Sequence, residues 1–162
     1  MHILVDKPMS RREVARPGVS ELGAREISLT IPVAADMEIV ATAQASALGE
    51  FIQMPRDKID EVKLAIVEAC INAFEHAHSR DDRVHLTFRV GREESGPEFL
   101  EVEVLDQGEG FEHLSVEIPS PEKTFEEGMK RGWGLQIIRS LMDSVAITSG
   151  DWGTRILMRK YK

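Results

Sequence analysis

Three polar side chains that could bind a ligand recur every fourth residue in the middle of the chain, namely Glu68, Asn72 and His76. Residues four apart lie on the same side of a helix, so this spacing would align a carboxylate, an amide and an imidazole. Apolar residues follow the helical period beside them: Ile59, Val62, Ile66, Ala69 and Ala73. Polar groups that border an apolar face often bind something. Taken alone, however, such a pair is more often a solvated stripe, and His76 could simply interact with the C-terminal helix dipole.

The segment from Asp106 to Gly110 places an aspartate and two glycines directly after a predicted strand. Gly108 and Gly110 allow backbone conformations that are closed to other residues, so the chain can turn tightly against a ligand. An aspartate at a strand end can accept a hydrogen bond from an amino group in a closed pocket. The pattern alone also fits a simple turn or part of a calcium loop, but Gln107 and Phe111 do not suit calcium coordination.

A third group, Gly132-Trp133-Gly134-Leu135, opens a predicted helix. Free backbone N–H groups and the positive end of the dipole make a helix N-terminus a natural phosphate site. The segment matches neither a P-loop nor a dinucleotide-binding glycine motif. The alternative interpretation is a flexible hinge with Trp133 as a packing anchor.

Gly153 and Thr154 begin the last predicted strand. On their own they indicate no more than a hairpin turn through residues 150–153. They suggest a functional role only in combination with the three groups that precede them in the chain.

Hydrophobic periodicity predicts the elements that must hold these groups. Period-two alternation predicts a strand at 26–31, which Pro32 ends. A helix is predicted at 36–54, with Asp36 as its N-cap. Its expected apolar stripe consists of Val40, Ala43, Ala47, Leu48 and Phe51.

The helix that would carry Glu68 and Asn72 is predicted at 57–78, with Asp57 as its N-cap. The remaining predicted elements are a helix at 134–142 and strands at 84–90, 100–104, 145–148 and 154–161. The first two of these strands have one apolar and one polar face and are joined by a predicted hairpin loop, so we expect helices on one side of the sheet only. We therefore predict an α/β two-layer sandwich in which helices cover one face of a mixed, mostly antiparallel sheet.

The composition is that of a single soluble domain, with 162 residues of which 42% are hydrophobic and 30% charged. A formal net charge of −8 gives no sign of a nucleic-acid or anionic-membrane surface. The single cysteine, Cys70, excludes an internal disulfide and is expected to be a small core residue. No apolar segment is long enough to span a bilayer and no signal peptide is recognisable, so we expect a cytoplasmic protein.

Two segments lack a sustained period. Residues 1–24 mix charges, prolines and glycines and are expected to form a flexible arm, which leaves 25–162 as the folded domain. Residues 112–131 contain Pro119, Pro121 and many charges. Loops of that length inside a compact domain are usually functional lids or disordered, and we expect a lid.

The order and spacing of the four groups resemble the conserved boxes of the Bergerat-fold (GHKL) ATPases and kinases. The matching patterns are E-x-x-x-N-A-x-x-H on a helix, D-x-G-x-G-F after a strand, G-x-G-L opening a helix and G-T opening the last strand. The short chain, the lack of a helical hairpin with a phosphoacceptor histidine, and the phrases Lys63–Ala69 and Arg131–Ile138 are typical of the anti-sigma-factor serine/threonine-protein kinases. The resemblance covers about residues 26–161.

This resemblance implies ATP and Mg²⁺ as cofactors and a role for each group. Asn72 would coordinate the Mg²⁺ that bridges the phosphates, and Glu68 would act as general base on a serine hydroxyl. Asp106, supported by Thr154, would accept a hydrogen bond from the adenine amino group. The other residues implied to contact the nucleotide are His76, Gly108, Gly110, Lys130, Arg131, Gly132, Trp133, Gly134 and Leu135, with Lys130 or Arg131 neutralising phosphate charge.

Members of that family dimerise, hold a sigma factor inactive and phosphorylate a serine on a small antagonist protein. We therefore expect a homodimer with these two kinds of partner, and neither nucleic acid nor a membrane. The arm is longer than the family usually carries, so the regulated partner could be something other than a sigma factor. A non-catalytic, nucleotide-gated binding module is the alternative, which Glu68 disfavours because a pure binder needs no carboxylate beside Asn72. The ATPase half of a sensor histidine kinase is disfavoured by the missing helical hairpin.

Overall fold

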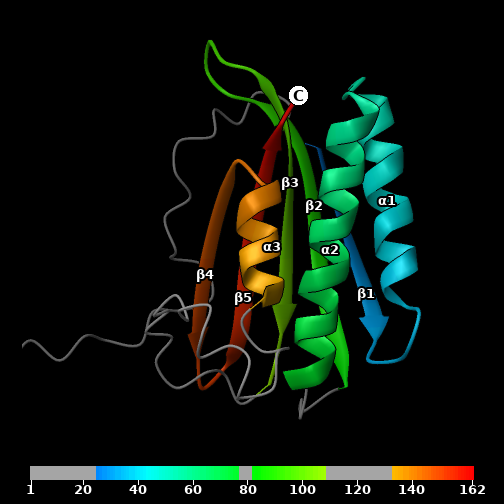
Figure 1. Ribbon diagram of the computed structural model, residues 1–162, viewed down its shortest axis with the longest axis vertical. Coiled ribbons are helices and arrows are strands. Elements are labelled where there is room, and N and C mark those ends of the chain that lie inside the picture. Colours follow the sequence, from blue (N-terminus) through cyan, green and yellow to red (C-terminus); the bar gives the residue numbers. More distant parts are fainter. Residues whose placement is uncertain (1–24, 77–81, 109–132) are drawn as a thin grey trace, which may run out of the picture.

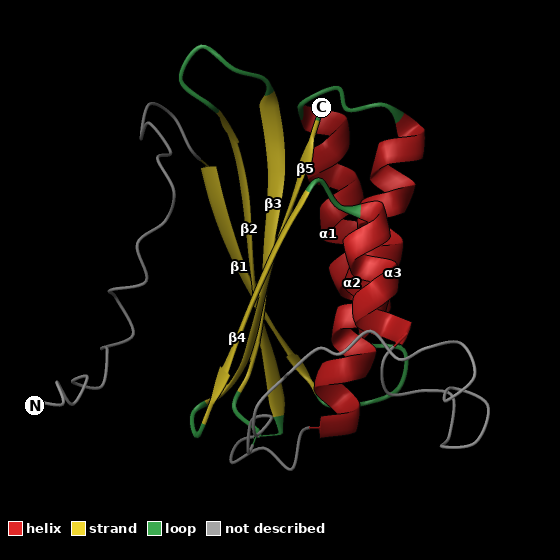
Figure 2. Ribbon diagram, turned by 60° about the vertical axis from the view of Figure 1, so that its left-hand side comes forward, coloured by secondary structure: helices red, strands yellow, loops and turns green. Residues whose placement is uncertain are grey.

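The computed structural model describes residues 25–76, 82–108 and 133–162. These residues form a five-stranded sheet with three helices on one of its faces (Figures 1 and 2). The elements are, in chain order, β1 (Arg25–Pro32), α1 (Glu38–Phe51), α2 (Arg56–His76), β2 (Arg83–Arg92), β3 (Glu98–Asp106), α3 (Trp133–Leu141), β4 (Ser144–Gly150) and β5 (Gly153–Tyr161). The predicted two-layer sandwich is therefore confirmed, and most strands are one or two residues longer at each end than the periodicity indicated.

The strand order is β1-β2-β3-β5-β4, and each pairing between these described strands is antiparallel. β3 is the central strand, where Val104 faces Leu86 of β2 on one side and Ile156 of β5 on the other. These residues belong to the core between the sheet and the helices, together with Phe88, Val90, Leu100, Val102, Met158 and Ile138. The alternation of β2 and β3 thus places their apolar faces against the helix layer, as expected.

α2 runs through the middle of the helix layer between α1 and α3 (Figure 1). Its predicted apolar stripe is confirmed, because Ile59, Val62, Ile66, Ala69 and Ala73 are all at most 6% exposed. Cys70 is completely buried beside them, as expected for a core residue. The side of α2 that carries Glu68 and Asn72 is therefore fixed by the packing of the opposite stripe.

Of the apolar stripe predicted for α1 only Leu48 is buried, and the rest of the prediction is wrong. The buried residues of this helix are Ala41, Ala45, Leu48 and Gly49. Val40 and Phe51, which were expected in the core, are 45% and 57% exposed. α1 is apolar on nearly every side, so its hydrophobic period does not indicate which face is buried. Close packing against α2 determines that face, since a Cβ at Gly49 would lie 2.7 Å from Cγ1 of Ile59.

The two predicted N-caps are also wrong. Met37 occupies the N-cap position of α1 and forms no capping side-chain hydrogen bond, while Asp36 precedes it with φ of +67°. α2 begins at Arg56, so Asp57 lies inside its first turn, where a carboxylate still interacts favourably with the helix dipole.

The outer face of the sheet carries a row of charged side chains that crosses four strands. Arg89 of β2 binds Glu26 of β1 and Glu101 of β3, and Arg159 of β5 binds the other side of Glu101. Arg89, Glu101 and Arg159 are each at most 9% exposed although no helix covers them. We call this row the ion-pair ladder.

No helix in the described part of the chain is long and apolar enough to cross a membrane.

Candidate functional site

Glu68 and Asn72 meet the first turn of α3. A Cβ built on Gly134 would lie 3.0 Å from Asn72 Nδ2, 3.1 Å from Asn72 Oδ1 and 3.1 Å from Glu68 Oε2. Both side chains therefore rest directly against the Gly134 backbone, and no larger residue fits at that position without moving them. Two groups that lie more than sixty residues apart in the sequence form one cluster, because α2 and α3 pack side by side.

Asn72 contains a buried polar atom that the described residues leave without a partner. Its Nδ2 is inaccessible and forms no hydrogen bond with any described residue. An unpaired buried amide costs about 1–3 kcal/mol, so such a group usually has a binding role. Within the same described residues, Glu68 also forms no ion pair, which leaves its carboxylate available to a ligand.

Asp106 forms a second polar corner at the end of β3. Its Oδ1 accepts hydrogen bonds from the backbone N–H of Gly108 at 2.9 Å and from that of Thr154 at 3.3 Å. The residue is 6% exposed, so these bonds hold a carboxylate in a fixed orientation inside the fold. The expectation that this segment turns sharply after the strand is confirmed by the Gly108 bond.

The start of β5 closes tightly on that corner. Thr154 pairs with Asp106 in the sheet register, and its hydroxyl lies 3.0 Å from the hydroxyl of Ser149. Gly153 has φ of +121°, and a Cβ there would overlap the carbonyl of Asp106. Only glycine fits this turn, which gives Gly153 a structural role beyond that of an ordinary hairpin residue.

Both clusters lie at the same end of the molecule. Figure 1 shows the C-terminal part of α2, the start of α3, the end of β3 and the start of β5 together in the lower half of the view. A ligand that reaches both clusters would extend from a buried carboxylate at the sheet to an amide and a helix N-terminus above it. That arrangement suits a molecule with an amino group at one end and phosphates at the other.

Several predicted site residues cannot be placed. Gly110, Lys130, Arg131 and Gly132 lie outside the described residues, as do the expected arm at 1–24 and the expected lid at 112–131. His76 is the last described residue of α2, and its side chain is not described.

The two remaining predicted residues differ in their surroundings. Trp133 is 55% exposed, so it is not the packing anchor that the alternative interpretation requires. Leu135 packs against the core, so only its backbone N–H, in the first turn of α3, could face a ligand.

The structure adds residues that sequence reasoning missed. Ser149 positions the Thr154 hydroxyl, and its only signal was a hydroxyl residue next to the predicted hairpin turn. His85 lies 3.5 Å from the side-chain amide of Gln107, the residue that follows Asp106. Nothing in the spacing of β2 pointed to that contact.

A reactive cysteine and a cluster of metal-binding side chains often mark active sites, and the described residues contain neither. Burial raises the pKa of Cys70 to about 12, so this thiol is not a nucleophile. Among the described residues no group of three or more His, Cys, Asp or Glu side chains could hold a metal. The donor set that does exist, one amide beside one carboxylate, fits Mg²⁺, because that ion takes few protein ligands and completes its shell with water and phosphate oxygens.

Comparisons with known proteins agree with this geometry. Residues 33–160 match the family of the histidine kinase-like ATPase domain. A serine-protein kinase RsbW of Bacillus velezensis is 29% identical over 139 residues, which are 83% of this chain and 84% of the relative. The serine-protein kinase RsbW of Bacillus licheniformis is 34% identical over 109 residues, which are 65% of this chain and 66% of the relative.

A solved structure supports the same fold. The RsbU and RsbW domains of a Mycobacterium tuberculosis protein superpose with a TM-score of 0.60 at 17% identity, over 85% of this chain and 32% of that chain. This chain thus spans about a third of the solved one. Since the matched family spans nearly all of the described fold, the chain belongs to the histidine kinase-like ATPase domain family, and its relatives there are RsbW serine-protein kinases.

Proposed function

We propose that this protein is an ATP- and Mg²⁺-dependent protein-serine kinase that acts as an anti-sigma factor in a partner-switching circuit. The observation that carries the proposal is the cluster in which the Gly134 backbone touches both the Glu68 carboxylate and the Asn72 amide. A kinase must hold phosphates, a metal and a proton acceptor within one site, and this cluster offers a group for each.

The nucleotide is held at two points. Asp106 accepts a hydrogen bond from the adenine amino group, with Thr154 beside it, and both belong to a corner that the backbone already orders. The N–H groups at the start of α3, including that of Gly134, bind the phosphates. Asn72 would supply an oxygen to Mg²⁺, and the bound ion would neutralise phosphate charge.

Glu68 accepts the proton of the incoming serine hydroxyl. The serine oxygen bonds to the γ-phosphorus while the bond from that phosphorus to ADP breaks, so the products are phosphoserine and ADP. Asn72 lies one turn beyond Glu68 on α2, so the base and the metal ligand stand side by side.

The similarity to serine-protein kinases supports the partners that we propose. The substrate is a small antagonist protein with a phosphorylatable serine, and the kinase, as a homodimer, also holds a sigma factor or another regulator. A phosphate added to the antagonist brings negative charge into the packed interface, and this charge releases the antagonist from the kinase.

Residues 112–131 act as a lid over the nucleotide, and Lys130 or Arg131 neutralises phosphate charge. The other nucleotide contacts are made by His76, Gly108, Gly110, Gly132, Trp133 and Leu135. The protein works in the cytoplasm.

Substitution of Glu68 separates a kinase from a nucleotide-gated binder. Glu68→Gln keeps the shape of the side chain but removes the base, so phosphate transfer should slow by about 10²–10⁴-fold while Mg-ATP binding stays nearly unchanged. The measurement is single-turnover transfer from radiolabelled ATP to the antagonist recovered from the source cell.

Glu75→Gln is the matched control, because Glu75 is exposed on the same helix. A Glu68→Gln variant that transfers phosphate at the wild-type rate would show that Glu68 is not the base. A wild-type protein that binds Mg-ATP and its partner but transfers nothing would favour the non-catalytic binder.

A further inference from the structure

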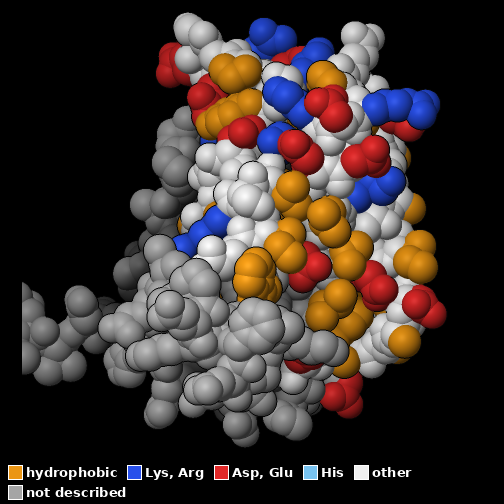
Figure 3. Space-filling view, in the orientation of Figure 1, with side chains coloured by type: hydrophobic (Ala, Val, Ile, Leu, Met, Phe, Trp, Pro, Cys, Tyr) orange, Lys and Arg blue, Asp and Glu red, His pale blue; other side chains and the backbone are white. Residues whose placement is uncertain are grey.

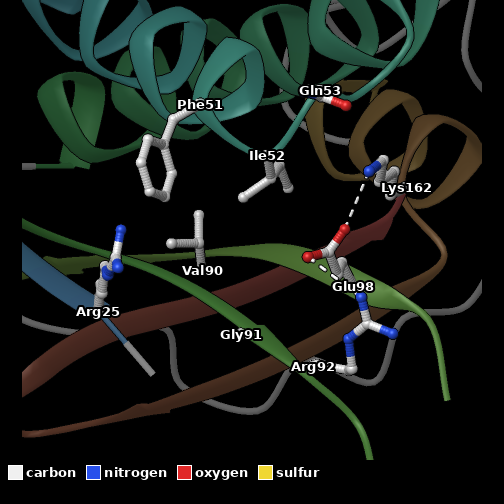
Figure 4. A pocket seen from close by; sticks show the side chains of 9 residues that line it. All are labelled: Arg25, Phe51, Ile52, Gln53, Val90, Gly91, Arg92, Glu98 and Lys162. Atoms are coloured by element: carbon white, nitrogen blue, oxygen red, sulfur yellow. Dashed lines mark hydrogen bonds and ion pairs between the residues drawn. The ribbon is translucent and has the colours of Figure 1, made fainter. Parts of the chain in front are cut away.

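A cavity of about 540 Å³ lies at the end of the molecule opposite to the Glu68–Asn72–Gly134 cluster. Its roof is the C-terminal end of α1, with Phe51 and Ile52, and its floor is Val90 and Gly91 of β2 (Figure 4). The volume falls within the usual range of about 300–1,000 Å³ for sites that bind small molecules. Arg25, Arg92, Glu98 and Lys162 line its open sides.

The charges around this cavity are unbalanced. Among the described residues that line it are three cations and one carboxylate, Glu98, although the whole chain carries a net charge of −8. Lys162 Nζ lies 2.9 Å and Arg92 Nη2 lies 3.3 Å from the two oxygens of Glu98. The hydrogen bond from Lys162, with the Arg92 charge, lowers the pKa of Glu98, so the carboxylate stays ionised. Figure 3 shows Lys and Arg side chains at this upper end of the molecule, interspersed with Asp and Glu side chains.

Arg25 has no carboxylate of its own. Its guanidinium lies 4.7 Å from the centre of the Phe51 ring, and it forms no hydrogen bond or ion pair with any described residue. Five N–H donors are therefore open toward a ligand, on a side chain already held against an aromatic face. The Arg92 side chain is 65% exposed and has only the one partner among the described residues, so it offers further donors beside the same cavity.

Phe51 is the apolar side chain that is open to this cavity. Phe51 and Ile52 project toward the sheet and Val90 projects toward them, with Arg25 on one side and Glu98, Arg92 and Lys162 on the other (Figure 4). Val90 and Ile52 are buried, whereas Phe51 is 57% exposed and could be covered by a flat ligand. A ligand for this space needs an apolar body for Phe51 and a negative group for an arginine.

We propose that this cavity is a second ligand site, which binds a small organic anion carrying a carboxylate or a phosphate on a flat apolar body. The anionic group pairs with Arg25 at one side of the cavity or with Arg92 at the other, and a planar guanidinium group suits both chemistries. The apolar body lies against the exposed part of Phe51. This site does not depend on the proposed kinase activity, because it shares no residue with the nucleotide cluster.

Three naphthalene compounds test the ligand class with the full chain. Isothermal titration of 1-naphthyl phosphate and of 1-naphthaleneacetate, both in saturating Mg-ATP, should give saturable binding of one molecule per chain. The neutral 1-naphthaleneacetamide should bind about tenfold more weakly or worse, because it cannot pair with the arginines. A preference between the two anions identifies the phosphate or the carboxylate as the natural group. Equal binding of the neutral compound, or loss of all binding once Mg-ATP is present, would overturn the proposal.

Substitutions then locate the site. Either Arg25→Gln or Arg92→Gln should weaken binding of the anions about tenfold, which identifies the arginine that holds the anionic group, and substitution of Arg139, an exposed arginine on α3 outside the cavity, by glutamine should leave binding unchanged. Glu98→Gln should instead tighten binding about two- to fivefold, since it removes the carboxylate that competes for Arg92 and Lys162. A gain of affinity cannot come from misfolding. Wild-type affinity in both arginine variants, or weaker binding in Glu98→Gln, would overturn the assignment.

Discussion

Asn72 is the residue whose surroundings most require a ligand. Its Nδ2 is buried without a partner among the described residues, and its side chain rests against Gly134, which has no side chain of its own. Glu68 one turn earlier is equally free of ion pairs in that part of the chain. A stable fold would normally satisfy or solvate such groups, so their retention here favours a binding role.

Replacing Asn72 by alanine should weaken ATP binding in the presence of Mg²⁺ by about tenfold or more, because alanine supplies no oxygen to the metal. The same substitution should matter little when EDTA removes the metal. Titration of a fluorescent ATP analogue with and without Mg²⁺ measures both effects. Gln44→Ala on α1 is the control, and unchanged Mg²⁺-dependent affinity of Asn72→Ala would remove Asn72 from the metal site.

Asp106→Asn tests the adenine contact. The remaining oxygen can still accept from the N–H groups of Gly108 and Thr154, so the corner should stay folded. The new amino group, however, places a donor where adenine needs an acceptor, and ATP affinity should fall about tenfold or more. Competition titrations with ATP and GTP measure the ratio of the two affinities. A variant with the wild-type affinity and the wild-type preference for ATP would contradict the role assigned to Asp106.

At the scale of the elements, the site depends on how β5 meets β3. The β4–β5 hairpin turns at Gly153, and this turn brings Thr154 opposite Asp106. The close approach leaves no room for a side chain at Gly153. The hairpin therefore determines both the sheet register and the orientation of the Asp106 carboxylate.

Gly153→Ala should reduce the free energy of unfolding by about 2 kcal/mol or more, since the residue has a positive φ and its new methyl group would overlap the Asp106 carbonyl. ATP affinity should fall as well, because relief of the overlap moves β5 away from Asp106. Urea unfolding and ATP titration are the two measurements. Gly150→Ala in the same hairpin is the control: the atoms nearest to its methyl group belong to the exposed ring of Trp152, which can turn away, so a smaller loss is expected. Equal losses in the two variants would contradict the argument.

At the scale of the whole molecule, the ion-pair ladder connects four of the five strands on the face that the helices leave open. Burial alone would lower the pKa of Arg89 and of Arg159, but the hydrogen bonds that they donate, chiefly to Glu26 and Glu101 respectively, outweigh it and raise both pKa values. A raised arginine pKa adds stability that is fully present below the ordinary pKa and lost only as the pH rises through the raised one. The arginine charges therefore contribute throughout the neutral and acidic range.

Glu101→Gln should destabilise the protein by about 3–5 kcal/mol, the usual loss when one partner of a buried ion pair is removed. Glu101 is 4% exposed and binds Arg89 and Arg159 at once, so the substitution leaves two buried guanidinium groups short of a carboxylate. Thermal or urea unfolding measures the loss. Asp60→Asn removes an exposed pair with Lys63 and should change stability by only about 0.5 kcal/mol, and a similar small change in Glu101→Gln would show that the ladder contributes little.

The sequence by itself determined the parts of the fold that a strong period specifies. The stripe of α2 leaves one face for the core, so the side that carries Glu68 and Asn72 could be predicted. The alternation in β2 and β3 indicated a sheet covered on one face, and the aspartate before Gly108 indicated a turn. In each case the physical reason is local: the helical or strand period is written in neighbouring residues.

Only the tertiary structure decided what lies against these elements. α1 is apolar on nearly all sides, and its close packing against Ile59 of α2 buries Ala41 and Ala45 and leaves Val40 exposed. No spacing in the sequence could show that Gly134 touches Asn72, because that contact depends on the packing of α3 against α2. The same holds for Arg89 and Glu101, which the alternation placed on a polar face, and for Arg159, since these charges are buried where neighbouring strands bring them together.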